Sequence, residues 1–257
     1  AQADAALVGR LLALALQRPD GHVQHVVEHA GGHLDHLDKG GIVDDLMVTR
    51  WDERTLYIVV NAACKDKDFA YIRSKIGHET ELEYLGERAL VALQGPKAEA
   101  ALSALIPDAA RLFFMTSFKT VYKGQPLFIS RSGYTGEDGY EISLPAAFAE
   151  TFTRELLANN DVKLIGLGAR DSLRLEADLP LYGHDLDTET TPIMAALGFA
   201  VASKRRREEA NFPGATRILM ERENGPVAKR VGLKMTLVIL NKVLRQRRNW
   251  LTPKLMA

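Results

Sequence analysis

The sequence predicts a mixed α+β fold, and two observations lead to this prediction. Short β-branched and aromatic runs alternate along the chain with segments whose apolar residues recur every three or four positions. Glycine and proline separate these segments at intervals typical of turns. Strands interleaved with helices in this way indicate sheets that pack against helices.

The first segment, before residue 40, contains periodic leucines and a group of histidines. Leucines over 7–16 predict a short amphipathic helix. Histidines at 22, 25, 29, 33 and 36 would share one face of a helix, where imidazoles one turn apart can bind a metal ion. Gly31 and Gly32 disfavour that helix, and no cysteine or carboxylate completes a defined motif. We therefore expect no metal site.

A hairpin and a helix are predicted next. The apolar stretch 41–48, the turn-like stretch 51–54 and the β-branched run 56–60 have the pattern of a β-hairpin. Apolar residues at helical spacing over 65–77 then predict a helix that ends at a glycine.

Strands and helices continue to alternate in the second half. The run 89–93 predicts a buried strand, and a helix should begin after Gly95 and Pro96. The remaining expected elements are strands over 119–122, 126–131 and 140–144 and helices over 146–157 and 169–177.

Composition limits the classes of ligand. The 33 basic and 33 acidic side chains cancel, so that the chain lacks the bulk charge of a nucleic-acid or anionic-membrane binder. We expect a soluble protein with a locally recognised ligand, no nucleic-acid partner and no membrane partner. Cys64 is the only cysteine, which excludes an intrachain disulfide and favours a structural thiol.

The most unusual stretch is 132–139, which contains three glycines and two carboxylates directly before a predicted strand. Glycines permit positive φ angles and close approach to a flat ligand, so the next strand can present a side chain into a pocket. Such a loop taken alone is more often a structural turn.

A colinear series of motifs extends over about 40–233: Gly-Gly-Ile-Val-Asp-Asp-Leu at 40–46, Leu-Gln-Gly-Pro at 93–96, Phe-Met-Thr-Ser at 114–117, the glycine-rich loop, Ala-Arg-Asp-Ser-Leu-Arg-Leu-Glu-Ala at 169–177, Leu-Tyr-Gly-His-Asp at 181–185 and Thr-Thr-Pro at 190–192. In order and spacing these motifs resemble the aminomethyltransferase (T-protein) family of the glycine cleavage system.

This resemblance implies a T-protein-like folate-binding fold with only the start of the C-terminal β-barrel domain. The implied domains are an unmatched segment over 1–39, a folate-binding aminomethyltransferase region over 40–207, and an incomplete barrel domain with an off-pattern tail over 208–257. We therefore expect a chain that is truncated at both ends relative to the family.

The implied activity is the transfer of a one-carbon unit from aminomethyl-lipoyl H-protein to tetrahydrofolate, with release of ammonia. The implied partner is the lipoylated H-protein, and no metal is implied. The basic run 204–207 and the Phe-Pro-Gly-Ala motif at 212–215 resemble the mitochondrial branch, which places the protein in the matrix.

Four site residues follow from the resemblance. Asp45 matches the catalytic aspartate, and a carboxylate beside an amine can accept a proton or stabilise a developing cation. Glu141 matches a folate-binding glutamate, which can accept two parallel pterin N–H groups. Arg170 matches a folate-contacting arginine, and Asn61 matches a position near the same pocket. We predict that Asp45, Glu141 and Arg170 converge on one concave surface.

Several alternatives stay open at this stage. Without the resemblance, the Asp44–Asp45 pair is surface charge and Arg170 pairs with Asp171. Within the superfamily, the alternatives are a protein like sarcosine or dimethylglycine dehydrogenase, and an iron–sulfur assembly-like protein, whose lysine-glycine-cysteine-tyrosine loop this chain lacks. A non-catalytic truncated remnant is the third alternative.

Overall fold

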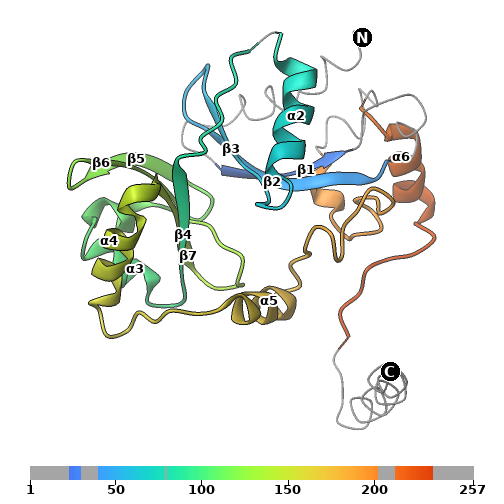
Figure 1. Cartoon of the computed structure of the whole chain (residues 1–257). Helices are drawn as coiled ribbons and strands as arrows, with labels where there is room; N and C mark the ends of the chain where they lie inside the picture. Colours follow the sequence, from blue (N-terminus) through green and yellow to red (C-terminus); the bar gives the residue numbers. More distant parts are fainter. Residues whose placement is uncertain (1–22, 30–39, 79, 202–211, 234–257) are drawn as a thin grey trace, which may run out of the picture.

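Two antiparallel sheets form the framework of this computed structural model, which describes residues 23–29, 40–78, 80–201 and 212–233 (Figure 1). The first sheet has the order β1-β2-β3. It comprises β1 (Val23–His29), β2 (Ile42–Arg50) and β3 (Leu56–Val59). The predicted hairpin is confirmed, because Met47 pairs with Val59 and Arg50 with Leu56 across β2 and β3.

The histidine segment differs from the helix that we considered. Residues Val23–His29 form β1, which pairs antiparallel with β2 over its whole length. A helix that contains His25 and His29 is therefore wrong, because pairing with β2 extends this part of the backbone. The leucine-rich stretch 7–16 lies outside the described residues.

The helix α2 (Lys65–Ile76) follows β3 and confirms the helix predicted over 65–77. Acidic Asp66 and Asp68 lie in its first turn and basic Arg73 and Lys75 in its last, which complements the helix dipole. In Figure 1, α2 lies against the first sheet.

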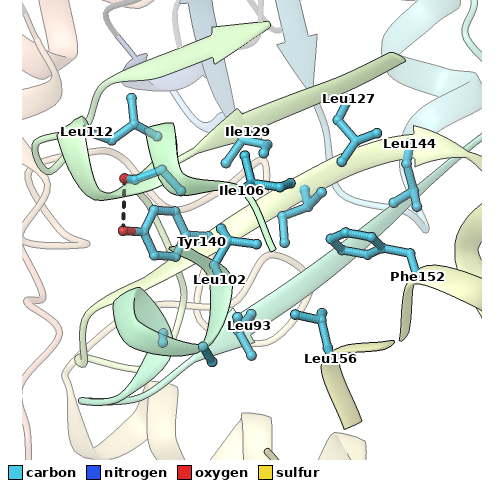
Figure 2. Close-up of a cluster of buried hydrophobic side chains, with 14 residues drawn as sticks. Leu93, Leu102, Ile106, Leu112, Leu127, Ile129, Tyr140, Leu144, Phe152 and Leu156 are labelled. Atoms are coloured by element: carbon cyan, nitrogen blue, oxygen red, sulfur yellow. Dashed lines mark hydrogen bonds between the residues drawn. The ribbon is translucent and has the colours of Figure 1, made fainter. Parts of the chain in front are cut away.

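The second sheet has the order β4-β7-β6-β5 and contributes to the largest cluster of buried apolar side chains among the described residues. Its members are β4 (Arg88–Gln94), β5 (Ser117–Tyr122), β6 (Gln125–Ser130) and β7 (Gly139–Pro145). The helices α3 (Ala98–Ser103) and α4 (Ala146–Leu157) pack on one face, with the 3₁₀ helix η1 (Pro107–Arg111) after α3. Figure 2 shows the core that these elements bury, in which the Tyr140 hydroxyl donates to the Ala109 carbonyl at 3.2 Å.

Alternation along these strands separates the core from the opposite face. Tyr140, Ile142 and Leu144 of β7 are fully buried in the core, whereas Glu141 and Ser143 point to the other side. The buried strand predicted over 89–93 is correct as a strand but wrong in its burial. Leu90 is 47% exposed because β4 is an edge strand whose second face borders a cavity.

The chain then returns to the first sheet. The helices α5 (Leu167–Glu176) and α6 (Ala215–Asn224) flank the 3₁₀ helix η2 (Gly198–Ala200). The start of β2 rests on 187–190, where the Ile42 amide donates to the carbonyls of Asp187 and Thr190. A Cβ on Gly41 would lie 1.6 Å from the Thr188 carbonyl oxygen, so only glycine permits this contact.

Residues 212–233 contain α6 and, within this described stretch, no strand. The tail 234–257, where the predicted barrel would continue, lies outside the described residues. Among the helices that the structure describes, none combines the length and apolar character needed to cross a membrane.

Candidate functional site

A small, partly open cavity lies between the two sheets. One wall comes from β2 and β3 and the other from β4 to β7. The lining residues are Met47, Thr49, Trp51, Tyr57, Val59, Leu90, Ser117, Phe128, Ile129, Ser130, Ser132, Glu141 and Ser143. The first wall is largely apolar and the second contains four serines and a glutamate, which suits a flat ligand with a polar edge.

Glu141 is the carboxylate in this cavity. It lies on β7 opposite Ser130 of β6 and Ala92 of β4, and the Ser132 hydroxyl donates to its Oε2 at 2.9 Å. Burial raises the pKa of the nearby Tyr57 hydroxyl, and the charge of Glu141 adds to this rise. The glutamate is therefore held by a side chain of the glycine-rich loop and faces the space between the sheets.

Aromatic rings close the end of the cavity formed by Trp51. The Trp51 and Phe128 ring centroids are 5.5 Å apart, and Tyr57 meets Phe128 edge-on at 5.4 Å. The Arg88 guanidinium lies 4.0 Å from the Phe128 ring centroid and donates to the Ser143 carbonyl at 2.7 Å. These contacts give the cavity a rigid apolar end.

Asp45 lies on the same face of β2 as Met47 and Thr49, because side chains two residues apart share a face. It is half-buried, whereas its neighbour Asp44 is fully buried on the opposite face. The two neighbouring aspartates therefore differ in burial. The reading of both as surface charge is wrong for Asp44.

Asn61 connects the two aspartates at the end of β3. Its Nδ2 donates to Asp44 Oδ1 and to Asp45 Oδ1, both at 2.8 Å. Its backbone N–H also donates to Asp44 Oδ2 at 3.3 Å. The structure therefore places the Asn61 amide against both carboxylates.

Asp44, Cys64 and Asp68 place potential metal ligands within 4.8 Å of one another. Both Asp44 oxygens, however, accept hydrogen bonds from Asn61. Burial raises the pKa of the Cys64 thiol, with the Asp44 charge adding to the rise, and metals bind the thiolate. Asp44 is therefore already hydrogen-bonded and Cys64 is protonated, and neither state favours metal binding.

The glycine-rich loop is fixed by Gln94, at the end of β4. The Gln94 Nε2 donates to the Ser132 carbonyl at 3.0 Å and the Tyr140 carbonyl at 3.3 Å, while its Oε1 accepts from the Thr135 hydroxyl at 3.0 Å. Its side chain fills the space that Cβ atoms would take at Gly133 and Gly139. The motif at 93–96 and the loop at 132–139 are therefore one structural unit.

Replacing Gly133 by alanine is expected to destabilise this unit by about 2 kcal/mol, because the new Cβ would lie 1.8 Å from Gln94 Oε1 and displace hydrogen-bonded groups. Urea unfolding measures the change. Gly166→Ala is the control, because Gly166 has open space around it and a negative φ.

A double variant, Gln94→Ala with Gly133→Ala, isolates the cause. If Gln94 is the obstacle, the two losses are less than additive. Full additivity would mean that the glycine is needed for another reason.

A bidentate ion pair closes the base of the same loop. Arg131 Nη2 lies 2.6 Å from Asp138 Oδ2, and Arg131 Nε donates to Asp138 Oδ1 at 2.9 Å. Glu99 of α3 adds a third contact at 2.7 Å. The hydrogen bonds from Arg131 lower the pKa of Asp138, so this clamp weakens only when the pH falls below the usual range of an aspartate.

Tyr134 lies in the glycine-rich loop and contacts Arg170. The Arg170 guanidinium stacks 4.6 Å from the Tyr134 ring centroid, and the Tyr134 hydroxyl donates to the Pro180 carbonyl. Burial raises the pKa of Tyr134 to about 12, and the charge of Asp45 adds to this rise while Arg174 and Arg170 oppose it. The ring therefore contacts the predicted folate-contacting arginine and feels the charge of the predicted catalytic carboxylate.

Helix α5, which contains Arg170, is held by Arg174. Arg174 is the one buried residue of this helix. Its guanidinium contacts Asp185 Oδ2 at 2.5 Å and Asp171 Oδ1 at 2.9 Å, and it donates to the Leu179 carbonyl at 3.3 Å. The alternative in which Asp171 pairs with Arg170 is wrong, because Asp171 pairs with Arg174.

The structure brings some of the predicted site residues together. Asn61 contacts Asp45, Arg170 stacks on Tyr134, and Glu141 lines the cavity. Asp45, Asn61 and Arg170 are not among the residues that line this cavity. Sequence reasoning did not single out Tyr134, Asp44 or Gln94. Tyr134 stood inside the glycine-rich loop, so an aromatic residue between glycines was the signal that could have identified it.

Comparisons with known proteins identify the family. The family model described as GCVT N-terminal domain matches residues 34–205. The probable mitochondrial aminomethyltransferase of Schizosaccharomyces pombe is 46% identical over 199 residues, which is 76% of this chain and 51% of that protein. The mitochondrial aminomethyltransferase of Canis lupus familiaris is 47% identical over 204 residues, or 76% of this chain and 50% of that protein.

A solved structure gives the same result. The glycine cleavage system aminomethyltransferase T from Bartonella henselae superposes with a TM-score of 0.70 at 39% identity, over 81% of this chain and 55% of that one. The chain spans about half the length of the curated relatives it matches. The match over 34–205 nevertheless covers the described cavity, the glycine-rich loop and α5. This chain belongs to the aminomethyltransferase family, the T-protein family of the glycine cleavage system.

Proposed function

We propose that the cavity between the sheets binds tetrahydrofolate and that the chain contains the folate-binding and catalytic part of an aminomethyltransferase. The reaction transfers a one-carbon unit from the aminomethyl-lipoyl arm of the H-protein to tetrahydrofolate and releases ammonia. The supporting observation is the placement of one carboxylate, Glu141, inside the cavity and a second, Asp45, on the β2 face that lines it.

Each carboxylate has its own task in this proposal. Glu141 accepts the adjacent N–H groups at the edge of the pterin ring, while the Ser132 hydroxyl fixes its orientation. Asp45 faces the folate nitrogens, accepts a proton and offsets the positive charge that develops on the transferred carbon. Arg170, stacked on Tyr134, meets an anionic or carbonyl oxygen of the folate.

The reaction balances without a redox step. Two bonds of the transferred carbon break, one to sulfur and one to the amino nitrogen, and two bonds form to folate nitrogens. The two protons that leave those nitrogens end on the departing thiolate and on ammonia. Asp45 is the carboxylate placed to relay one of them, and no metal takes part in this proposal.

Glu141→Gln is expected to weaken tetrahydrofolate binding by tenfold to a hundredfold, since one of two charge-assisted hydrogen bonds is lost at about 1.5–3 kcal/mol. Titration calorimetry under reducing conditions measures the affinity. Glu150→Gln is the control, because Glu150 is exposed on α4 and pairs only with Arg154 among the contacts described. Equal affinity for parent and Glu141→Gln would remove Glu141 from the folate site.

We also propose a partner and a cellular location. The lipoylated H-protein is the proposed aminomethyl donor, and the mitochondrial matrix is the proposed compartment. Relatives from yeast, potato and dog are named as mitochondrial aminomethyltransferases, which supports this location. The domain boundaries at 39 and 207 are also proposed. Strand β1 lies before the first boundary but pairs with β2, so it belongs to the first sheet.

A further inference from the structure

A buried polar layer lies directly behind Asp45. Asp44 is 0% exposed and shares its side of the first sheet with Cys64 and Asp68. Asn61 follows β3 at the position that faces Asp45 when the Met47–Val59 register is continued by two residues. The chain turns there into α2, as the Cys64 N–H donates to the Asn61 carbonyl at 2.9 Å. Asn61 therefore has a fixed backbone next to both aspartates.

The hydrogen bonds of Asn61 fix which way its amide points. An amide nitrogen has two hydrogens. The Asn61 Nδ2 lies 2.8 Å from Asp44 Oδ1, 2.8 Å from Asp45 Oδ1 and 3.2 Å from the Asp45 carbonyl oxygen, and all three are acceptors. In the flipped orientation the amide oxygen would face two carboxylates, which accept but do not donate when ionised. The nitrogen must therefore point to the aspartates.

The burial of Asp44 explains why this amide stays in place. A carboxylate removed from water needs hydrogen-bond donors. Asp44 receives the Asn61 side-chain amide on Oδ1 and the Asn61 backbone N–H on Oδ2. Any rotation of Asn61 away from Asp45 would also remove a donor from this buried group. Asp44 thereby holds the amide in the orientation that Asp45 requires.

We propose that Asn61 and Asp44 are positioning residues, in which Asp44 anchors the Asn61 amide and that amide holds the Asp45 carboxylate toward the cavity. This inference rests on the proposed function of Asp45. It assigns Asn61 a role different from that of a folate ligand, because both of its side-chain donors are already engaged. In this proposal Asp44 and Asn61 affect the ligand by positioning Asp45.

Two single variants test this role by separating binding from transfer. Asn61→Ala and Asp44→Asn are expected to lower the single-turnover rate of transfer at least tenfold, while the dissociation constant of tetrahydrofolate changes less than twofold. Tenfold weaker binding with an unchanged transfer rate in Asn61→Ala would make Asn61 a ligand contact and overturn the proposal. A rate loss in Asn61→Ala without one in Asp44→Asn would overturn the anchoring role.

An exchange variant separates positioning from simple stabilisation. Asp44→Asn with Asn61→Asp keeps one amide in contact with one carboxylate, but places a carboxylate instead of a donor against Asp45. Urea unfolding monitors folding in each variant. Transfer is expected to stay at least tenfold low in the folded exchange variant. Recovery of transfer together with stability would reduce Asn61 and Asp44 to a structural pair and overturn the proposal.

A readout without folate keeps this proposal separate from the proposed function. The Asn61 side-chain NH₂ signals in a ¹⁵N spectrum, assigned by their loss in Asn61→Ala, are expected to shift in both Asp44→Asn and Asp45→Asn. If they shift while tetrahydrofolate fails to bind the parent, the proposed function fails and the positioning contact stands. If tetrahydrofolate binds and the signals are unmoved, the positioning role is wrong.

Discussion

Replacing Arg174 by alanine is expected to lower the free energy of unfolding by about 3 kcal/mol, which is the usual cost of removing one partner from a buried ion pair. The side chain of Arg174 is 7% exposed, and it contacts Asp171, Asp185 and the Leu179 carbonyl. Alanine removes all of these contacts, so that Asp185 Oδ2 keeps the Leu181 N–H as a donor at 3.0 Å but loses its ion pair, and the Leu179 carbonyl loses the guanidinium. Because Asp185 retains some access to water, the loss falls at the lower end of the range for buried pairs.

The matched control is Arg154→Ala on α4. Arg154 also pairs with a carboxylate, Glu150, but both side chains are about three-quarters exposed. Exposed pairs at helical spacing contribute about 0.3–0.5 kcal/mol. Urea unfolding of both variants measures the difference, and similar losses would show that Arg174 does not hold α5 to the rest of the chain.

The same variant has a predicted consequence for the site. Helix α5 has one buried side chain, Arg174, and presents Arg170 to Tyr134 one turn earlier. Loosening the helix should therefore move Arg170 away from the ring and weaken tetrahydrofolate binding in parallel with stability. Arg174→Lys keeps a charge but loses the fork that reaches several acceptors, so its effect should lie between those of the parent and alanine.

Most elements could be predicted from the sequence because local pattern determines them. Apolar residues over 146–157 recur at helical spacing after Pro145, and α4 has these bounds. The strand after the glycine-rich loop also occurs where β-branched residues and alternation indicate it. The helix considered for the histidine segment is wrong because the spacing of residues in the sequence does not show which strand they pair with. Pairing with β2 makes Val23–His29 a strand.

The contacts of the predicted site residues could not be derived from the sequence. The family motifs predicted Asp45, Asn61, Glu141 and Arg170, while nothing in their spacing shows that Arg170 stacks on Tyr134. Asp44 illustrates the limit most clearly. Alternation predicted that it points away from Asp45. Its burial and its two hydrogen bonds from Asn61 depend on α2 and the end of β3, which only the folded chain brings together.

Asp45→Asn is expected to lower the rate of one-carbon transfer about a hundredfold, which corresponds to about 3 kcal/mol, as when one oxyanion-hole donor is removed. The amide keeps the shape of the side chain but removes its charge and its basicity. Folate affinity should be nearly unchanged, because binding rests on Glu141 in the cavity and on Arg170 beside Tyr134. The defect therefore belongs to the step in which positive charge develops on the transferred carbon.

The measurement is single-turnover transfer from aminomethylated H-protein to tetrahydrofolate, with affinity determined separately by titration. It should be made on this chain and on a full-length family member with the equivalent substitution. The Asp45→Asn variant also converts the group facing the Asn61 amide from an acceptor-only carboxylate into an amide, whose oxygen can still accept that hydrogen bond. Folding should therefore be retained. Unchanged transfer would remove Asp45 from the mechanism, and weakened binding with normal transfer would make it a binding residue alone.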